Sequence, residues 1–105
     1  MSVELVTRVL KWRLPLTQKA LAVALADAVG PDGDGRGRHM TIDWLSRTWG
    51  MSPALVIRAI SRLLDRGVLM EATLTSGPSA TISEWIFDIE YPARNRGHRN
   101  RRSSR

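Results

Sequence analysis

The segment TIDWLSRTWGMSPALVIRAISRLLDRGVL, residues 41–69, contains the clearest structural signals in this 105-residue chain. Ser52 can cap a helix with its hydroxyl, and Pro53 suits the first helical position because its fixed φ is already helical. Thr41 is placed to cap a shorter helix in the same way. Apolar residues then recur at helical spacing after each start. The segment therefore predicts two helices, over residues 42–49 and 53–66.

The three residues between these helices predict a tight turn. Gly50 suits the left-handed conformation that ends a helix, and Gly67 suits the end of the second one. Ser46 is a small residue four positions before Gly50, where the second helix would cross closely. Apolar residues that can fix the crossing angle flank the turn: Leu45, Trp49, Met51, Val56 and Ile60. This arrangement predicts a helix-turn-helix whose second helix presents a polar, cationic face.

Two alternating segments after Gly67 predict a β-hairpin. Residues 68–75 place Val68, Met70, Ala72 and Leu74 on one face. Residues 76–79 predict a turn. From Thr81 onward, Trp85, Phe87, Ile89 and Tyr91 alternate with mostly acidic residues, Glu84, Asp88 and Glu90. We therefore expect an apolar inner face and an acidic outer face.

The N-terminal third predicts two more helices, over residues 3–12 and 17–29, the second capped by Thr17. Residues 32–37 contain three glycines and predict an irregular loop. The helix within residues 2–12 is apolar enough either to pair two chains as a homodimer or to pack on its own core. The fold class expected is α+β, mainly α with a β-hairpin, in one domain over residues 1–92, followed by a disordered tail over residues 93–105.

Charge is unevenly distributed along the chain, whose formal net charge is +6. Residues 36–66 are basic, residues 67–93 are acidic, and residues 94–105 carry six arginines and no acid. Clustered cations of this kind favour nucleic acid as a partner, through contacts with phosphates. The tail residues expected to contact phosphates are Arg94, Arg96, Arg99, Arg101 and Arg102.

The segment 41–69, the preceding QKALAVALADAV and the hairpin together resemble the winged helix-turn-helix family, over residues 17–91. The chain looks most like the small helix-turn-helix modules of bacterial, plasmid and phage regulatory and replication proteins. The resemblance implies three to four helices, a recognition helix over residues 52–66, a wing formed by the hairpin, and binding of double-stranded DNA, often as a dimer.

Carried over onto this sequence, the resemblance implies contacts from the recognition helix and from arginines beside it. The groove-facing candidates are Ser52, Ala54, Leu55, Arg58, Ser61 and Arg62. Arg58 and Arg62 are four residues apart, so they project from one side of the helix and can bind a guanine or a phosphate. Flanking phosphates would be contacted by Arg47, Arg36 and Arg38. The expected role is regulation of transcription or control of replication.

Two other interpretations remain open. Leu55 and Ile57 lie near the proposed reading face, and the hairpin is acidic, so the chain could be a protein-docking module. The arginine-rich tail could instead bind RNA. The four tryptophans are expected to be packing residues rather than stacking platforms for bases, with Trp44 the least suited to packing.

Enzymatic and metal chemistry find no support in the sequence. The chain has no cysteine, and His39 and His98 are far apart, so no frame for a zinc site exists. Asp32, Asp34 and Asp43 only partly match a calcium loop, which requires Glu at its last position. No serine has a convincing His/Asp partner, and the glycines at 33, 35 and 37 do not form a phosphate loop. We therefore expect no enzyme activity and no cofactor. With no signal segment or membrane span, we expect a cytoplasmic, nucleoid-associated protein.

Overall fold

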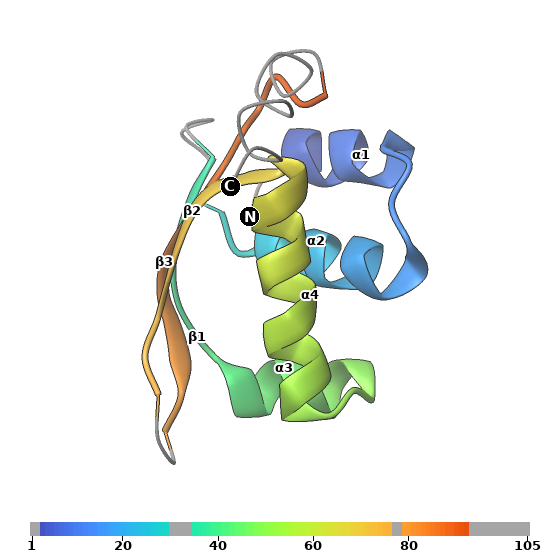
Figure 1. Ribbon diagram of the computed structural model, residues 1–105. Coiled ribbons are helices and arrows are strands. Elements are labelled where there is room, and N and C mark those ends of the chain that lie inside the picture. The colour runs from blue at the N-terminus through green and yellow to red at the C-terminus, as the bar shows by residue number, and fades with distance from the viewer. Residues whose placement is uncertain (1–2, 30–34, 77–78, 93–105) are drawn as a thin grey trace.

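The computed structural model describes residues 3–29, 35–76 and 79–92 (Figure 1). These residues form a small α+β fold of four helices and a three-stranded antiparallel sheet. In chain order the elements are α1 (Val3–Lys11), α2 (Leu16–Asp27), β1 (Arg36–Thr41), α3 (Ile42–Trp49), α4 (Pro53–Arg66), β2 (Leu69–Leu74) and β3 (Thr81–Phe87). The strand order is β1-β3-β2. The helices lie on one side of the sheet (Figure 1).

The two central helices begin and end where the sequence predicts. The Thr41 hydroxyl accepts the amide of Trp44 at 3.0 Å, which caps α3. The Ser52 hydroxyl accepts the amide of Leu55 at 3.1 Å, which caps α4. Gly50 has a φ of 65° at the end of α3. The two helices and the turn between them are thus confirmed.

The small residue predicted before this turn holds it together. The amide of Met51 donates to the carbonyl of Ser46 at 3.0 Å. The hydroxyl of Ser46 donates in the opposite direction, to the carbonyl of Met51. Ser46 therefore ties the end of α3 to the residue before α4, in addition to being small.

The predicted bounds of the first two helices are corrected. Helix α1 ends at Lys11, and the amide of Trp12 donates to Val9 in a tighter final turn. Helix α2 begins at Leu16 and ends at Asp27, with Pro15 at its N-cap and no side-chain cap. The Pro15 carbonyl accepts the amide of Lys19 at 2.8 Å. Thr17 therefore lies inside the helix, because proline before it already supplies a preorganised start.

The predicted loop over residues 32–37 is wrong at its C-terminal end, where β1 begins at Arg36 and pairs with β3. Gly37 lies in this strand opposite Trp85. A β-carbon at Gly37 would lie 2.2 Å from the Trp85 ring, so the indole occupies the space of a missing side chain. Glycine is needed here for close packing between strands, and not for a turn.

The hairpin is confirmed, but its predicted inner face is corrected. Leu69 is buried, whereas Met70 is 52% exposed and Leu74 is also exposed. The pairing between β2 and β3 shifts between Leu69 and Glu71, so the alternation that begins at Val68 is broken. On β3 the buried apolar residues are Ile82, Trp85 and Phe87, while Ile89 beyond the strand is exposed. Asp88, expected on the acidic outer face, is buried.

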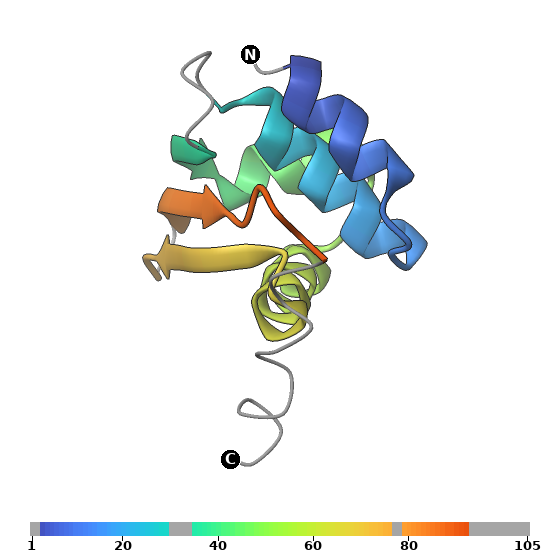
Figure 2. The same cartoon turned by 90° about the horizontal axis from the view of Figure 1, so that it is seen from above.

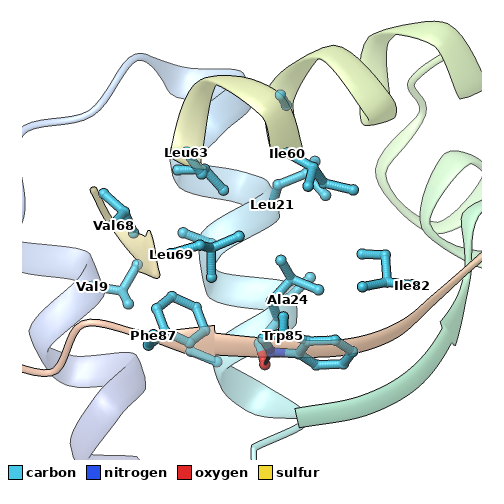
Figure 3. Close-up of a cluster of buried hydrophobic side chains, with 14 of the residues drawn as sticks. Val9, Leu21, Ala24, Ile60, Leu63, Val68, Leu69, Ile82, Trp85 and Phe87 are labelled. Atoms are coloured by element: carbon cyan, nitrogen blue, oxygen red, sulfur yellow. Dashed lines mark hydrogen bonds between the residues drawn. The ribbon is translucent and has the colours of Figure 1, made fainter. Parts of the chain in front are cut away.

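The core lies between the sheet and the helices, and Figure 3 shows its centre. Leu21 from α2 and Leu63 from α4 are fully buried, as are Trp85 and Phe87 from β3. The Trp85 indole donates to the carbonyl of Leu25 at 3.2 Å, which links the central strand to α2. This hydrogen bond satisfies the one polar group of the largest core side chain.

Helix α1 is attached to α2 and to the turn that follows β3. The rings of Trp12 and Tyr91 meet edge to face, with centroids 4.9 Å apart. The Arg8 guanidinium donates to the carbonyl of Ile89 at 2.6 Å. These contacts fix the orientation of α1. In the described ranges, no helix combines the length and the apolar character needed to cross a membrane.

Candidate nucleic-acid interface

Helix α4 has a buried face and an exposed, partly cationic face. It packs against α2, α3 and β2. Its buried residues are Val56, Ala59, Ile60 and Leu63. Of the side chains predicted to face a DNA groove, those of Ala54, Arg58, Ser61 and Arg62 are exposed. Seen from above in Figure 2, α4 lies at the edge of the molecule away from α1. Its outer face is therefore accessible to a large partner.

The two arginines lie one helical turn apart on this face. Side chains at i and i+4 are about 5–6 Å apart at their β-carbons. Both guanidiniums belong to exposed residues, while the buried face of α4 fixes the rotation of the helix. Chemically, the pair can bind two neighbouring phosphates or the acceptor atoms of a guanine.

Two predicted groove contacts at the start of α4 are less accessible than expected. Leu55 is only partly exposed. Ser52 is exposed, but its hydroxyl already accepts the amide of Leu55. The large apolar side chain that is exposed on this helix is Ile57, at 41%. Leu55 therefore contributes less to the outer face than the sequence suggested, and Ile57 contributes more.

Arg47 lies on α3, in an ion pair with Asp43 on the same helix. The distance between the Arg47 Nη2 and Asp43 Oδ2 atoms is 2.9 Å. The side chains remain 79% and 68% exposed, so water screens their attraction. Such a pair is weak, and a phosphate could replace the carboxylate as the partner of Arg47.

Arg36 and Arg38 are not brought together with the arginines of α4. Both lie on β1 and are exposed. In the strand order β1-β3-β2, β1 is at the opposite edge of the sheet from β2, and β2 is the strand that contacts α4 (Figure 2). The structure therefore separates these two predicted phosphate contacts from Arg58 and Arg62.

An open groove of about 540 Å³ lies where the starts of α3 and α4 meet the end of the hairpin turn. Its lining consists of Thr41, Ile42, Asp43, Arg47, Pro53, Ser79 and Ala80. The amide of Ile42 donates to the carbonyl of Ala80 at 3.0 Å, which holds the hairpin against α3. Sequence reasoning did not identify Ser79 and Ala80 as neighbours of Arg47, because only the strand pairing brings them there.

The two strands of the hairpin carry acids and no cation. Glu71 on β2 and Glu84 on β3 are exposed. Two aromatic side chains of α3 are also accessible, since Trp44 and Trp49 are partly exposed, whereas Trp12 and Trp85 are buried. The predicted packing role is thus confirmed for Trp12 and Trp85, whereas Trp44 and Trp49 are not core residues, contrary to the prediction.

The remaining sequence-based site predictions concern the tail and metal binding. The tail arginines, Arg94, Arg96, Arg99, Arg101 and Arg102, lie outside the described residues. Within the described ranges, no three or more His, Asp or Glu side chains cluster closely enough to hold a metal ion.

Comparisons with known proteins found no relative of this chain. No protein-family model matches the chain, and no curated protein and no solved structure matches it either.

Proposed function

We propose that this chain is a winged helix-turn-helix protein that binds double-stranded DNA, with α4 as its recognition helix. The observation that carries the proposal is the exposed pair Arg58 and Arg62 on a helix whose opposite face is buried. A helix with its side chains fits the major groove, which is about 12 Å wide. The order of elements supports the same conclusion, because two helices joined by a tight turn are followed directly by a hairpin.

In this proposal α4 reads the DNA sequence, and the cations around α4 supply most of the affinity. Arg58 and Arg62 can each donate two hydrogen bonds to a guanine, and Ser61 lies between them on the exposed face. Arg47 at the groove beside α4 would contact a phosphate. The arginines of the tail would add contacts that do not depend on sequence.

The cellular role proposed is regulation of transcription or control of replication, on bacterial, phage or plasmid DNA. Such a protein would be found with the nucleoid. The chain would act by occupying a DNA site and would catalyse no reaction.

A second candidate function is protein docking through α4 and the hairpin. The exposed Ile57 and the acidic residues Glu71 and Glu84 favour it. RNA binding through the tail is a third outcome that uses different residues. These candidates predict different patterns of binding, so one set of titrations separates them.

The test is fluorescence anisotropy with labelled duplex DNA, single-stranded DNA and RNA at low salt. The proposal expects duplex binding that weakens with salt and that falls in Arg58→Ala and Arg62→Ala, by about fivefold or more for each. Arg38→Ala is the matched control, because Arg38 is exposed at the far edge of the sheet and should change binding little.

Specificity is measured by selection from a random duplex pool. Enrichment of one sequence, lost in the Arg58→Ala variant, is the expected result. Binding that disappears only when the tail arginines become glutamine would overturn the role of α4. Absence of any nucleic-acid binding would leave docking as the better proposal.

A further inference from the structure

Helix α1 carries a second apolar face that points away from the core. Val3 is 69% exposed and Leu10 is 55% exposed, although both are large apolar residues on a helix. They are seven residues apart, so they lie on the same side of α1, two turns from each other. Exposed apolar side chains aligned in this way indicate a contact with another molecule.

The opposite side of α1 is already occupied. Leu5, Val9 and Trp12 are buried. Figure 2 shows α1 along the outer edge of the molecule, with α2 beside it on the inner side. Within residues 3–29, 35–76 and 79–92, the side chains of Val3 and Leu10 stay exposed, so this face is open to a partner.

The centre of this face is also suited to burial. Thr7 lies between Val3 and Leu10, and its hydroxyl donates to the carbonyl of Val3 at 2.8 Å. The hydroxyl is thus satisfied within the helix, and the methyl group of Thr7 is left for contact. A partner would meet no unsatisfied donor at the middle of the face.

Charges beside the apolar face show which partner fits. Glu4 and Lys11 lie along the same flank, one at each end of α1, and both are exposed. Glu4 also pairs with Arg8 of its own helix at 3.4 Å, but its side chain remains 82% exposed and open to a second cation. A second α1 that packs in the antiparallel direction would place its Lys11 beside Glu4 and its Glu4 beside Lys11. It would also place its Leu10 against Val3. The antiparallel direction pairs opposite helix dipoles as well.

We propose that α1 pairs with α1 of a second copy of this chain, antiparallel about a two-fold axis near Thr7. The same patch then serves both subunits, as two-fold symmetry requires. Arg8 fixes the patch in place, because its guanidinium donates to the Ile89 carbonyl of its own chain. The proposal does not depend on DNA binding, since no residue of α4 takes part.

The expected dimer is weak. Helix α1 has nine residues and is therefore about 13–14 Å long. A contact between two such helices buries less than the roughly 1,200 Å² of a stable interface. Monomer and dimer should therefore both be populated at micromolar protein concentrations. Each pair of charges should then change the dissociation constant of the dimer measurably.

The test is sedimentation equilibrium of the full chain without nucleic acid, from micromolar to submillimolar concentration. The expected result is a concentration-dependent dimer. Glu4→Lys alone and Lys11→Glu alone should each weaken it about tenfold, because two attractive pairs become two repulsive ones. An equimolar mixture of these two variants should form heterodimers, since each subunit then supplies the charge that the other needs.

Two further variants complete the design. Leu10→Ser should abolish the dimer without changing the circular dichroism spectrum. Glu71→Lys makes the same charge change as Glu4→Lys at an exposed position on β2, and should leave the dimer intact. A monomer at all concentrations would overturn the proposal. So would a dimer that survives Leu10→Ser, or variants that fail to complement each other when mixed.

Discussion

Helices α1 and α4 have similar inner faces and different outer faces. Each buries an apolar stripe against the rest of the molecule. Outside, α4 presents Arg58 and Arg62, whereas α1 presents Val3 and Leu10. The inner faces are constrained by packing in the core, whereas the outer faces are not. We therefore propose separate partners for the two helices, DNA for α4 and a second copy of the chain for α1.

The largest effects are expected on the inner faces. Leu63→Ala in α4 should lower the free energy of unfolding by about 2–5 kcal/mol, because Leu63 is fully buried at the centre of the core. Leu5→Ala in α1 should cost less, near the lower end of that range of about 2–5 kcal/mol, because α1 packs on one helix and a turn and can close the cavity. Urea denaturation measures both. An equal cost would mean that α1 is as constrained as α4.

A second pair of variants should distinguish the roles of the two outer faces. Arg58→Glu is expected to weaken duplex binding by about 1–3 kcal/mol while leaving the sedimentation profile unchanged. Leu10→Ser is expected to do the reverse, with binding to a single half-site preserved. Anisotropy and sedimentation of each variant provide the four measurements. A variant that changes both properties would show that the two faces are coupled.

The capped start of α4 should matter more than the uncapped start of α2. Ser52→Ala removes the hydrogen bond to Leu55 and should destabilise the protein by about 1 kcal/mol. Thr17→Ala is the control, because Thr17 makes no capping bond in α2. Thermal unfolding of the two variants measures the difference. Equal changes would contradict the assignment of Ser52 as the structural cap.

The smallest effects are expected at two exposed arginines, each paired with an acid one helical turn earlier. Arg47→Ala should change stability by about 0.5 kcal/mol or less. Arg8→Ala should cost more, since Arg8 also donates to the Ile89 carbonyl. Arg47→Ala should still reduce the salt dependence of duplex binding by about one unit if Arg47 contacts a phosphate. No reduction would remove Arg47 from the interface.

The sequence predicts α3, α4 and the turn between them because their signals are local. Thr41, Gly50 and Ser52 act within three or four residues of their own positions. The strand β1 is missed because Gly37 is typical of a loop. The need for glycine at this position comes from the Trp85 ring, which is contributed by a strand far along the chain. The inner face of β2 is missed because a shift in pairing with β3, and not the alternation of β2 itself, decides which residues are buried.

The candidate site follows the same division. The exposure of Arg58 and Arg62 follows from helical periodicity and is predicted. The burial of Asp88 and the distance of Arg36 and Arg38 from α4 depend on how elements meet. Residues contributed by one helix can therefore be found from the sequence, whereas a surface shared by a helix, a sheet edge and a turn needs the fold.

The contact between Gly37 and Trp85 makes the fluorescence of the Trp85 indole depend on three elements, β1, β3 and α2. The indole lies in the space above Gly37 of β1, and it donates to the Leu25 carbonyl of α2. Separation of β1 from β3 would admit water to this ring and move its fluorescence emission to longer wavelength. Trp44 and Trp49, which already contact solvent, would change little. The protein thus carries a natural optical reporter for opening at the edge of its sheet.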